Sequence, residues 1–170
     1  MKIKNWTILG LLIWTNSFAA TPTSDRPVAL INAKGEAVAI AMISKAKSGV
    51  KIRAELKGLT PGMHAIHFHE KGDCQAPSFA SAGGHFEPMK HKHGFYLKDG
   101  PHAGDMHNFM VAPDGTAKIE IVNNRVTLGR DKFSLIKEGG TALVIHQKQD
   151  DYKTQPSGDA GDRLLCGEIK

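Results

Sequence analysis

The sequence predicts an all-β fold: an antiparallel, eight-stranded Greek-key sandwich or flattened barrel with two long functional loops. Three observations favour it. Short runs of β-type residues recur between glycine-containing turns, two long polar stretches interrupt these runs, and no convincing helical period is present. A chain of 170 residues is long enough for one domain with a buried core and short for two, so we expect a single domain.

Residues 1–19 are expected to be a signal peptide. Two lysines precede an apolar run from Trp6 to Trp14, and the small residues Ser17 and Ala19 suit signal peptidase. A membrane anchor is the alternative, but the run is well below the roughly 20 residues that span a bilayer. We therefore expect a periplasmic or secreted protein, cleaved near Ala19 and not attached to a membrane.

A polar lead-in at residues 20–27 should precede a domain at residues 28–170. Eight strands are expected at residues 28–31, 37–43, 50–56, 63–69, 108–111, 116–122, 141–146 and 163–169, with a further short β-type piece around residues 126–128. From Val50 to Leu56, apolar residues alternate with charged ones, which predicts a strand with one buried face and one wet face.

Two long polar loops are expected at residues 70–104 and 147–162. Loops of this length are uncommon in compact domains unless they are functional or disordered. Eight of the nine histidines lie between His64 and His107, many of them in the first loop, and the ninth, His146, ends an expected strand. This clustering favours a functional loop.

The charge balance excludes some classes of partner. The whole chain has 22 basic and 17 acidic residues, and removing residues 1–19 takes away two lysines, which leaves a net charge of +3. Because the sequence has no polybasic run, nucleic acid is a poor partner. A net positive charge modestly favours a small anionic substrate.

Cys74 and Cys166 are the only cysteines. In an oxidising compartment an even pair is expected to form a disulfide, which here would tie the first long loop to the last strand. The alternative is two unrelated buried thiols, which we favour less because Cys74 lies in a polar stretch, GDCQAPS.

A metal site is indicated by His67 and His69, which project from the same face of an expected strand. The pair alone is weak evidence. Additional candidates are His85, His93, His102 and Asp105. Imidazole nitrogens with one carboxylate suit zinc or copper, whereas calcium and magnesium prefer oxygen ligands. The candidates exceed the needs of one tetrahedral site, which suggests two metals.

Six motifs in order carry a resemblance to a known family: HAIHFHEKGDC, SAGGHFEP, KHG, HAGD, VIHQKQDD and GDRLLCG. Together they resemble the copper,zinc superoxide dismutases, especially the exported bacterial members, over residues 28–170. The resemblance implies one copper and one zinc per subunit, dismutation of superoxide to oxygen and hydrogen peroxide, antioxidant defence outside the cytoplasm, and a monomer or homodimer.

The resemblance also implies roles for individual residues. The copper ligands would be His67, His69, His85 and His146. The zinc ligands would be His85, His93, His102 and Asp105. As the bridge between the metals, His85 would take up and release a proton, and Arg163 would attract superoxide at the channel mouth. Asp150 would hold two ligand rings, those of His67 and His93, through their other nitrogens.

Other functions are weighed against this one. A non-catalytic copper- or zinc-binding protein, or a copper-delivery protein on the same fold, would be expected to lack a copper ligand or Arg163, and neither is missing. A zinc hydrolase needs an open zinc with a nearby base, whereas the zinc site implied here already has four protein ligands. A purely structural sandwich leaves the ordered set of histidines unexplained. Two departures from the family pattern, Ala65 and the stretch 95–97, touch no expected ligand.

Overall fold

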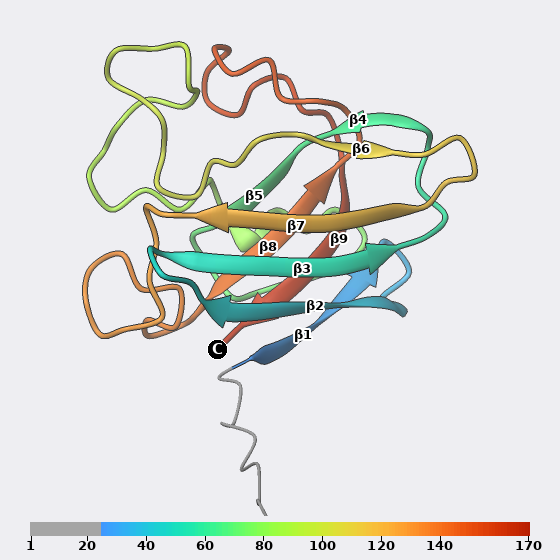
Figure 1. Ribbon diagram of the computed structural model, residues 1–170, viewed down its shortest axis with the longest axis horizontal. Coiled ribbons are helices and arrows are strands. Elements are labelled where there is room, and N and C mark those ends of the chain that lie inside the picture. The colour runs from blue at the N-terminus through green and yellow to red at the C-terminus, as the bar shows by residue number, and fades with distance from the viewer. Residues whose placement is uncertain (1–24) are drawn as a thin grey trace, which may run out of the picture.

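The all-β prediction is confirmed by a computed structural model, which describes residues 25–170 (Figure 1). The expected signal peptide and the start of the lead-in lie outside the described residues. The strands are β1 (Arg26–Asn32), β2 (Ala37–Lys45), β3 (Val50–Leu56), β4 (Gly62–His64), β5 (Ile66–His69), β6 (Phe109–Val111), β7 (Ala117–Asn123), β8 (Thr141–His146) and β9 (Arg163–Ile169). Within residues 25–170, the only helical element is a single 3₁₀ turn, Ala80–Ala82. No helix in this part of the chain has both the length and the apolar character needed to cross a membrane.

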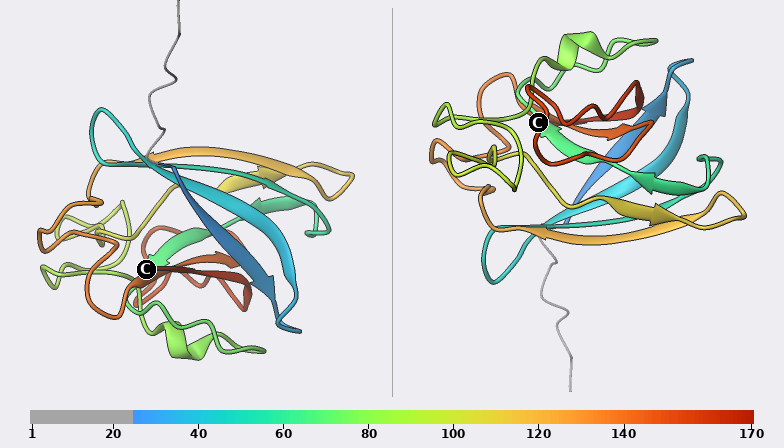
Figure 2. Two further views of the ribbon diagram at one scale, coloured as in Figure 1. Left: turned by 90° about the horizontal axis from the view of Figure 1, so that it is seen from below. Right: turned by 90° about the horizontal axis from the view of Figure 1, so that it is seen from above.

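Seven strands form one antiparallel sheet in the order β5-β8-β9-β1-β2-β3-β7, and β4 pairs with β6 in a second, small sheet. The large sheet curls so that its two ends approach each other (Figure 2). The second long loop contacts the first, since the Tyr96 N–H donates to the Tyr152 carbonyl. β9 lies beside β1 and β7 beside β3, although these strands are distant in the sequence. Such long-range neighbours are typical of the predicted Greek key.

The period of two in β3 has the predicted consequence. Val50, Ile52, Ala54 and Leu56 are buried, and Arg53 and Glu55 between them are exposed. Opposite β3, Ile119 of β7 pairs with Ala54 and supplies the same inner face. At about 25 cal/mol per Å² of buried apolar surface, these alternating side chains supply the main driving force for closing the sheet over one core.

The single strand expected at residues 63–69 is two strands, separated at Ala65. The Ala65 N–H donates to the Lys148 carbonyl at 2.8 Å, and the Ala65 carbonyl accepts from the His146 N–H at 2.9 Å. The chain therefore exchanges β6 for β8 as its partner at this residue. This exchange brings the histidines of β5 beside His146.

Two further boundaries differ from the prediction. β1 begins at Arg26, inside the expected lead-in, because Arg26 and Pro27 pair with the end of β2. Residues 126–128 do not form a strand of the sheet, since Thr127 bonds instead to Phe133 and Leu135 within the following loop.

The predicted disulfide joins Cys74 to Cys166, with a sequence separation of 92 residues. Both cysteines belong to a small buried cluster that includes Phe79, Ala82 and Val144, apart from the main core. A cross-link of this span removes denatured-state entropy worth about 4.6 kcal/mol on the chain-entropy description. The bond and its cluster anchor the first long loop to β8 and β9.

Candidate metal centre

Two groups of potential ligands lie next to each other. The strand group is His67, His69, His85 and His146, of which three lie on β5 and β8. The loop group is His85, His93, His102 and Asp105. Within each group the ligand atoms all lie within 4.8 Å of one another. His85 belongs to both groups, so the two candidate sites share one ring.

The pairing of β5 with β8 assembles the strand group. His67 is opposite Val144 and His69 is opposite Ala142. Residues directly opposite each other share a face, and so do residues two apart on one strand. His67, His69 and His146 therefore project from one face, while Phe68 projects from the other into the core.

Loop segments pair with the other edge of β5 and bring in His85 and Asp105. Isolated bridges join His69 to His85 and His67 to Asp105. Phe68 donates to the Gly104 carbonyl at 2.9 Å. A side chain at position 104 would place its Cβ 2.3 Å from the Phe68 carbonyl oxygen, so this close approach requires glycine.

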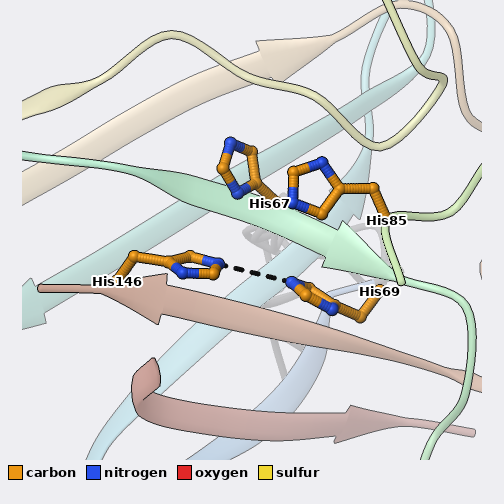
Figure 3. Close-up of side chains that lie close together, drawn as sticks. All are labelled: His67, His69, His85 and His146. Atoms are coloured by element: carbon orange, nitrogen blue, oxygen red, sulfur yellow. Dashed lines mark hydrogen bonds between the residues drawn. The ribbon is translucent and has the colours of Figure 1, made fainter. Parts of the chain in front are cut away.

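Within the strand group the rings face a common centre (Figure 3). The Nε2 atoms of His69 and His146 are 3.3 Å apart, and the ring centroids of His67 and His85 are 4.0 Å apart. All four residues are buried. Their nitrogens therefore converge in a space largely withdrawn from water.

In the loop group, the Asp105 carboxylate is the common partner. The Nδ1–H of His85 donates to Asp105 Oδ1 at 2.8 Å, and Nδ1 of His93 lies 3.0 Å from Oδ2. His102 Nδ1 is 3.5 Å from Oδ1. Backbone N–H groups of Gly94 and His102 also donate to Oδ2, which fixes the carboxylate in the loop.

Asp150 joins the two groups from behind. Its carboxylate accepts from His67 Nε2 at 2.9 Å and from His93 Nε2 at 3.0 Å. Each of these rings thereby turns its Nδ1 atom toward its own group. Gly158 covers the carboxylate so closely that any Cβ there would lie 1.9 Å from Asp150 Oδ1.

Four buried imidazole nitrogens within residues 25–170 have no hydrogen-bond partner: His67 Nδ1, His85 Nε2, His93 Nδ1 and His102 Nδ1. A buried polar atom without a partner is costly, and all four belong to the potential ligand groups. Nitrogen-rich sets with one carboxylate fit copper and zinc. The residues present therefore fit both metals.

The electrostatics favour neutral imidazoles at His69, His85 and His146. Burial, with smaller effects of neighbouring histidines, lowers the pKa of His69 and of His146 well below the usual value. Burial is also the main reason that the pKa of His85 falls to about 3. Neutral imidazole is the form that binds metals.

In the loop group and behind it, the charged forms of three side chains are favoured: His93, Asp105 and Asp150. Burial would lower the pKa of His93, but the adjacent Asp105 carboxylate and the hydrogen bond with Asp150 outweigh burial and raise the pKa to about 9. For Asp105 and Asp150, burial opposes ionisation, yet hydrogen bonds from the histidines hold each carboxyl pKa below its usual range. Both carboxyls are therefore anionic at neutral pH.

Arg163 begins β9 beside the strand group and is half-buried. Its guanidinium donates to the Phe79 carbonyl at 2.6 Å and to the Gly83 carbonyl at 2.7 Å. The Gly83 carbonyl also accepts from His69 Nδ1 at 2.9 Å. One backbone oxygen thus connects the arginine to a ring of the strand group.

Several residues that support the groups carried no sequence signal. The Asn123 amide donates to the Asp105 carbonyl, and the Arg125 guanidinium donates to the carbonyls of Asp105 and His102. Asn108 bonds to both backbone groups of Asp150. The sequence shows only that these three side chains can form hydrogen bonds, and it does not show with which partners.

Three histidines lie outside both groups. His64 is buried and bonds through Nδ1 to the His146 carbonyl at 2.7 Å and through Nε2 to the Thr60 carbonyl at 2.8 Å, as expected of a structural residue. The His91 side chain is 53% exposed and lies at the surface. His107 stacks on Phe95 with ring centroids 4.5 Å apart.

Residues 34–169 match the family model described as copper/zinc superoxide dismutase. Similar curated proteins include two from Aquifex aeolicus. Copper-zinc superoxide dismutase 2 is 48% identical over 143 residues, which are 83% of this chain and 84% of that protein. Copper-zinc superoxide dismutase 1 is 43% identical over 169 residues, which are 98% of this chain and 99% of that protein.

A similar solved structure is that of a superoxide-dismutase-like protein from Bacillus subtilis, in a double mutant that replaces a tyrosine and a proline by histidines. It superposes with a TM-score of 0.82 at 39% identity, covering 84% of this chain and 95% of the other.

Proposed function

The chain belongs to the copper/zinc superoxide dismutase family, and from this premise we propose a role for each residue of the two ligand groups. The protein converts superoxide to oxygen and hydrogen peroxide, with copper and zinc as its metals. When bound, copper supplies the one-electron couple for both halves of this reaction, and zinc supplies a fixed charge without redox chemistry.

The strand group holds copper, and the loop group holds zinc. The observation that carries this proposal is the set of four buried imidazole nitrogens without hydrogen-bond partners, distributed over both groups. The strand group offers imidazoles alone, which suit a metal that changes oxidation state. The loop group includes Asp105, which completes the set of three nitrogens and one oxygen typical of zinc.

His85 is shared between the metals. Its Nδ1 atom is directed to Asp105, and its Nε2 atom lies in the strand group without a protein partner. Because Nε2 has no competing hydrogen bond, it can hold a proton between the two half-reactions and release it to the reduced product. In the loaded protein, zinc held between His85 Nδ1 and Asp105 would keep the ring in place while the proton moves.

Asp150 orients one ring of each group. Its hydrogen bonds to His67 and His93 fix which nitrogen of each ring carries the proton. A carboxylate in this position also raises the basicity of the ring it holds. Asp150 therefore acts through ligands of both metals.

Arg163 docks the anion. Its guanidinium is fixed by two carbonyls beside the strand group, and arginine stays charged at any relevant pH. A fixed positive charge beside a site attracts superoxide and raises its local concentration. The carbonyl partners keep the charge at the edge of the site.

The protein acts outside the cytoplasm. Two independent features support this: the leader-like composition of residues 1–19, and the Cys74–Cys166 disulfide. Disulfides form and persist in oxidising compartments such as the periplasm.

The test loads the mature protein with copper and zinc and measures superoxide consumption for the parent, His146→Ala and the surface control His91→Ala. We expect the parent and His91→Ala to be active, and His146→Ala to lose at least about 100-fold, because the strand group is one ligand short. An inert, fully loaded parent would favour a copper-binding or copper-delivery role. Full turnover by His146→Ala would contradict the copper assignment.

A further inference from the structure

Three side chains beside the loop group have no role in the function proposed above, yet they contact one another closely. Phe95 and His107 stack with ring planes at 17°, and Tyr152 meets Phe95 edge to face with ring centroids 5.4 Å apart. Tyr152 and His107 are 5.9 Å apart in the same arrangement. We call Phe95, His107 and Tyr152 the aromatic clip.

The clip joins three separate segments at the loop group. Phe95 is two residues after His93, His107 is two residues after Asp105, and Tyr152 is two residues after Asp150. Aromatic pairs of this geometry contribute about 0.5–1.5 kcal/mol each beyond the area they bury. The clip therefore connects the segments that carry His93 and Asp105 to the segment that carries Asp150.

Tyr152 has direct links to the Asp150 carboxylate. Its N–H donates to Asp150 Oδ1 at 2.6 Å, and its hydroxyl accepts from the Asn108 N–H at 2.8 Å. The Asn108 side chain in turn accepts from the Asp150 N–H and donates to the Asp150 carbonyl. The position of the Tyr152 ring is thus coupled to that of the carboxylate between His67 and His93.

Phe95 has a comparable link to the opposite side of the loop group. The Arg125 guanidinium carbon lies 5.1 Å from the centre of the Phe95 ring. The same guanidinium donates to the carbonyls of His102 and Asp105. The preceding residue, Gly94, donates to Asp105 Oδ2 and approaches the Tyr152 carbonyl so closely that no Cβ would fit.

We propose that the aromatic clip is a positioning device for the zinc site: it holds Asp105 and Asp150 on opposite sides of His93 and so sets the affinity and geometry of the loop group. The proposal rests on the assignment of zinc to that group. No member of the clip is a ligand. Its effect passes through Asp150 on one side and through Arg125 on the other.

Tyr96 provides a matched control. Its ring also contacts Tyr152, at 5.5 Å, but the residue is 73% exposed. The bond that connects it to Tyr152 is made by its backbone N–H, which an alanine substitution retains. Tyr96→Ala therefore removes a neighbouring aromatic ring without removing the clip.

The experiment measures zinc affinity by competition with a chromophoric chelator, and the visible absorption of cobalt(II) bound in place of zinc. We expect Phe95→Ala to weaken zinc binding about tenfold and to alter the cobalt spectrum, as substitutions behind metal ligands do. Phe95→Tyr, which keeps the stacked ring, should recover both. Tyr96→Ala should stay within about twofold of the parent, because it leaves every link to the ligands in place.

Tyr152→Phe gives a second, milder test that retains the ring and removes the acceptor for Asn108. We expect zinc binding about threefold weaker, the loss of one hydrogen bond. If Phe95→Ala and Tyr152→Phe bind zinc like the parent with an unchanged cobalt spectrum, the clip has no positioning role. If the parent itself binds no zinc, or if Asp105→Ala binds it equally well, the zinc assignment fails instead.

Discussion

The two ligand groups are built in different ways, although they share His85. The strand group depends on backbone pairing: His67, His69 and His146 are placed by the register of β5 with β8. The loop group depends on side chains that bond to other loops, with the Asp105 carboxylate at its centre. Ligands on strands are preorganised by the core, whereas ligands on loops need supporting contacts and, we expect, the metal itself.

Removing one ligand from each group should give the largest difference between the two metal sites in turnover and in zinc binding. His69→Ala should reduce superoxide turnover at least about 100-fold while leaving zinc binding near normal, because it removes a ligand of the redox metal alone. His102→Ala should abolish tight zinc binding and reduce turnover far less. The measurements are metal content, zinc affinity and superoxide consumption. Equal effects of both variants on both metals would show that the groups are not separable.

Asp150→Asn should weaken both groups at once. An amide is isosteric, but it cannot accept hydrogen bonds from both rings through two carboxylate oxygens. We expect zinc affinity to fall about 10–100-fold, with a changed copper(II) paramagnetic resonance spectrum through His67. Asp151→Asn is the matched control, since that carboxylate bonds to Lys153 and Thr154 and to no ligand. A change in only one metal's site would confine Asp150 to that group.

The metal-free protein should lose stability as the pH falls from about 6.5 to about 5. The lowered pKa values of His69, His85 and His146 mean that the unfolded chain binds protons in this range and the folded chain does not. For His85 alone the loss is roughly 2 kcal/mol at pH 5. Chemical denaturation at several pH values measures it.

His93 contributes with the opposite sign. Its raised pKa stabilises the folded state fully below about pH 6.5, and that contribution is lost as the pH rises toward about 9. The stability of the metal-free protein should therefore be greatest near pH 6.5 to 7. A protein loaded with both metals should lose stability more steeply as the pH falls below neutral, since its ligated nitrogens bind no protons whereas those of the unfolded chain do. Rising stability of the metal-free protein below pH 6.5 would contradict this assignment.

Arg163→Ala should have the smallest effect of the four changes. We expect turnover about tenfold lower at unchanged metal content, with a deficit that shrinks as salt screens the charge. Arg163→Lys should recover part of the rate, because it restores the charge and not the fork of donors. Arg130→Ala removes the same charge from an exposed position and should change the rate little. A salt-independent deficit would indicate that Arg163 is structural.

Much of the fold could be predicted because the core follows local patterns. The alternation in β3 and the glycine-containing turns identify most strands within a few residues. The division at Ala65 could not be predicted, because it arises from backbone bonds to His146 and Lys148, about eighty residues away. The strand-like piece expected at residues 126–128 is wrong for a similar reason, because Thr127 bonds to Phe133 and Leu135 in the following loop.

The candidate site was easier to predict than its supports. Histidines and Asp105 stand out by residue type, and the family resemblance supplies an order for them. Asn108, Arg125 and Tyr152 are common surface residue types, and their importance comes from the partners that the folded loops bring to them. Phe95 carries no sequence signal for its role, which comes from its contacts with His107 and Tyr152 in the aromatic clip.

The sharing of His85 between the two metals can be measured directly. Copper is bound in the strand group, cobalt(II) replaces zinc in the loop group, and the copper(II) paramagnetic resonance signal is recorded beside that of the copper- and zinc-loaded protein. A ring that bridges both ions couples their unpaired electrons, so we predict that the copper signal largely disappears with cobalt and persists with zinc. A full copper signal with cobalt bound would contradict the shared ring.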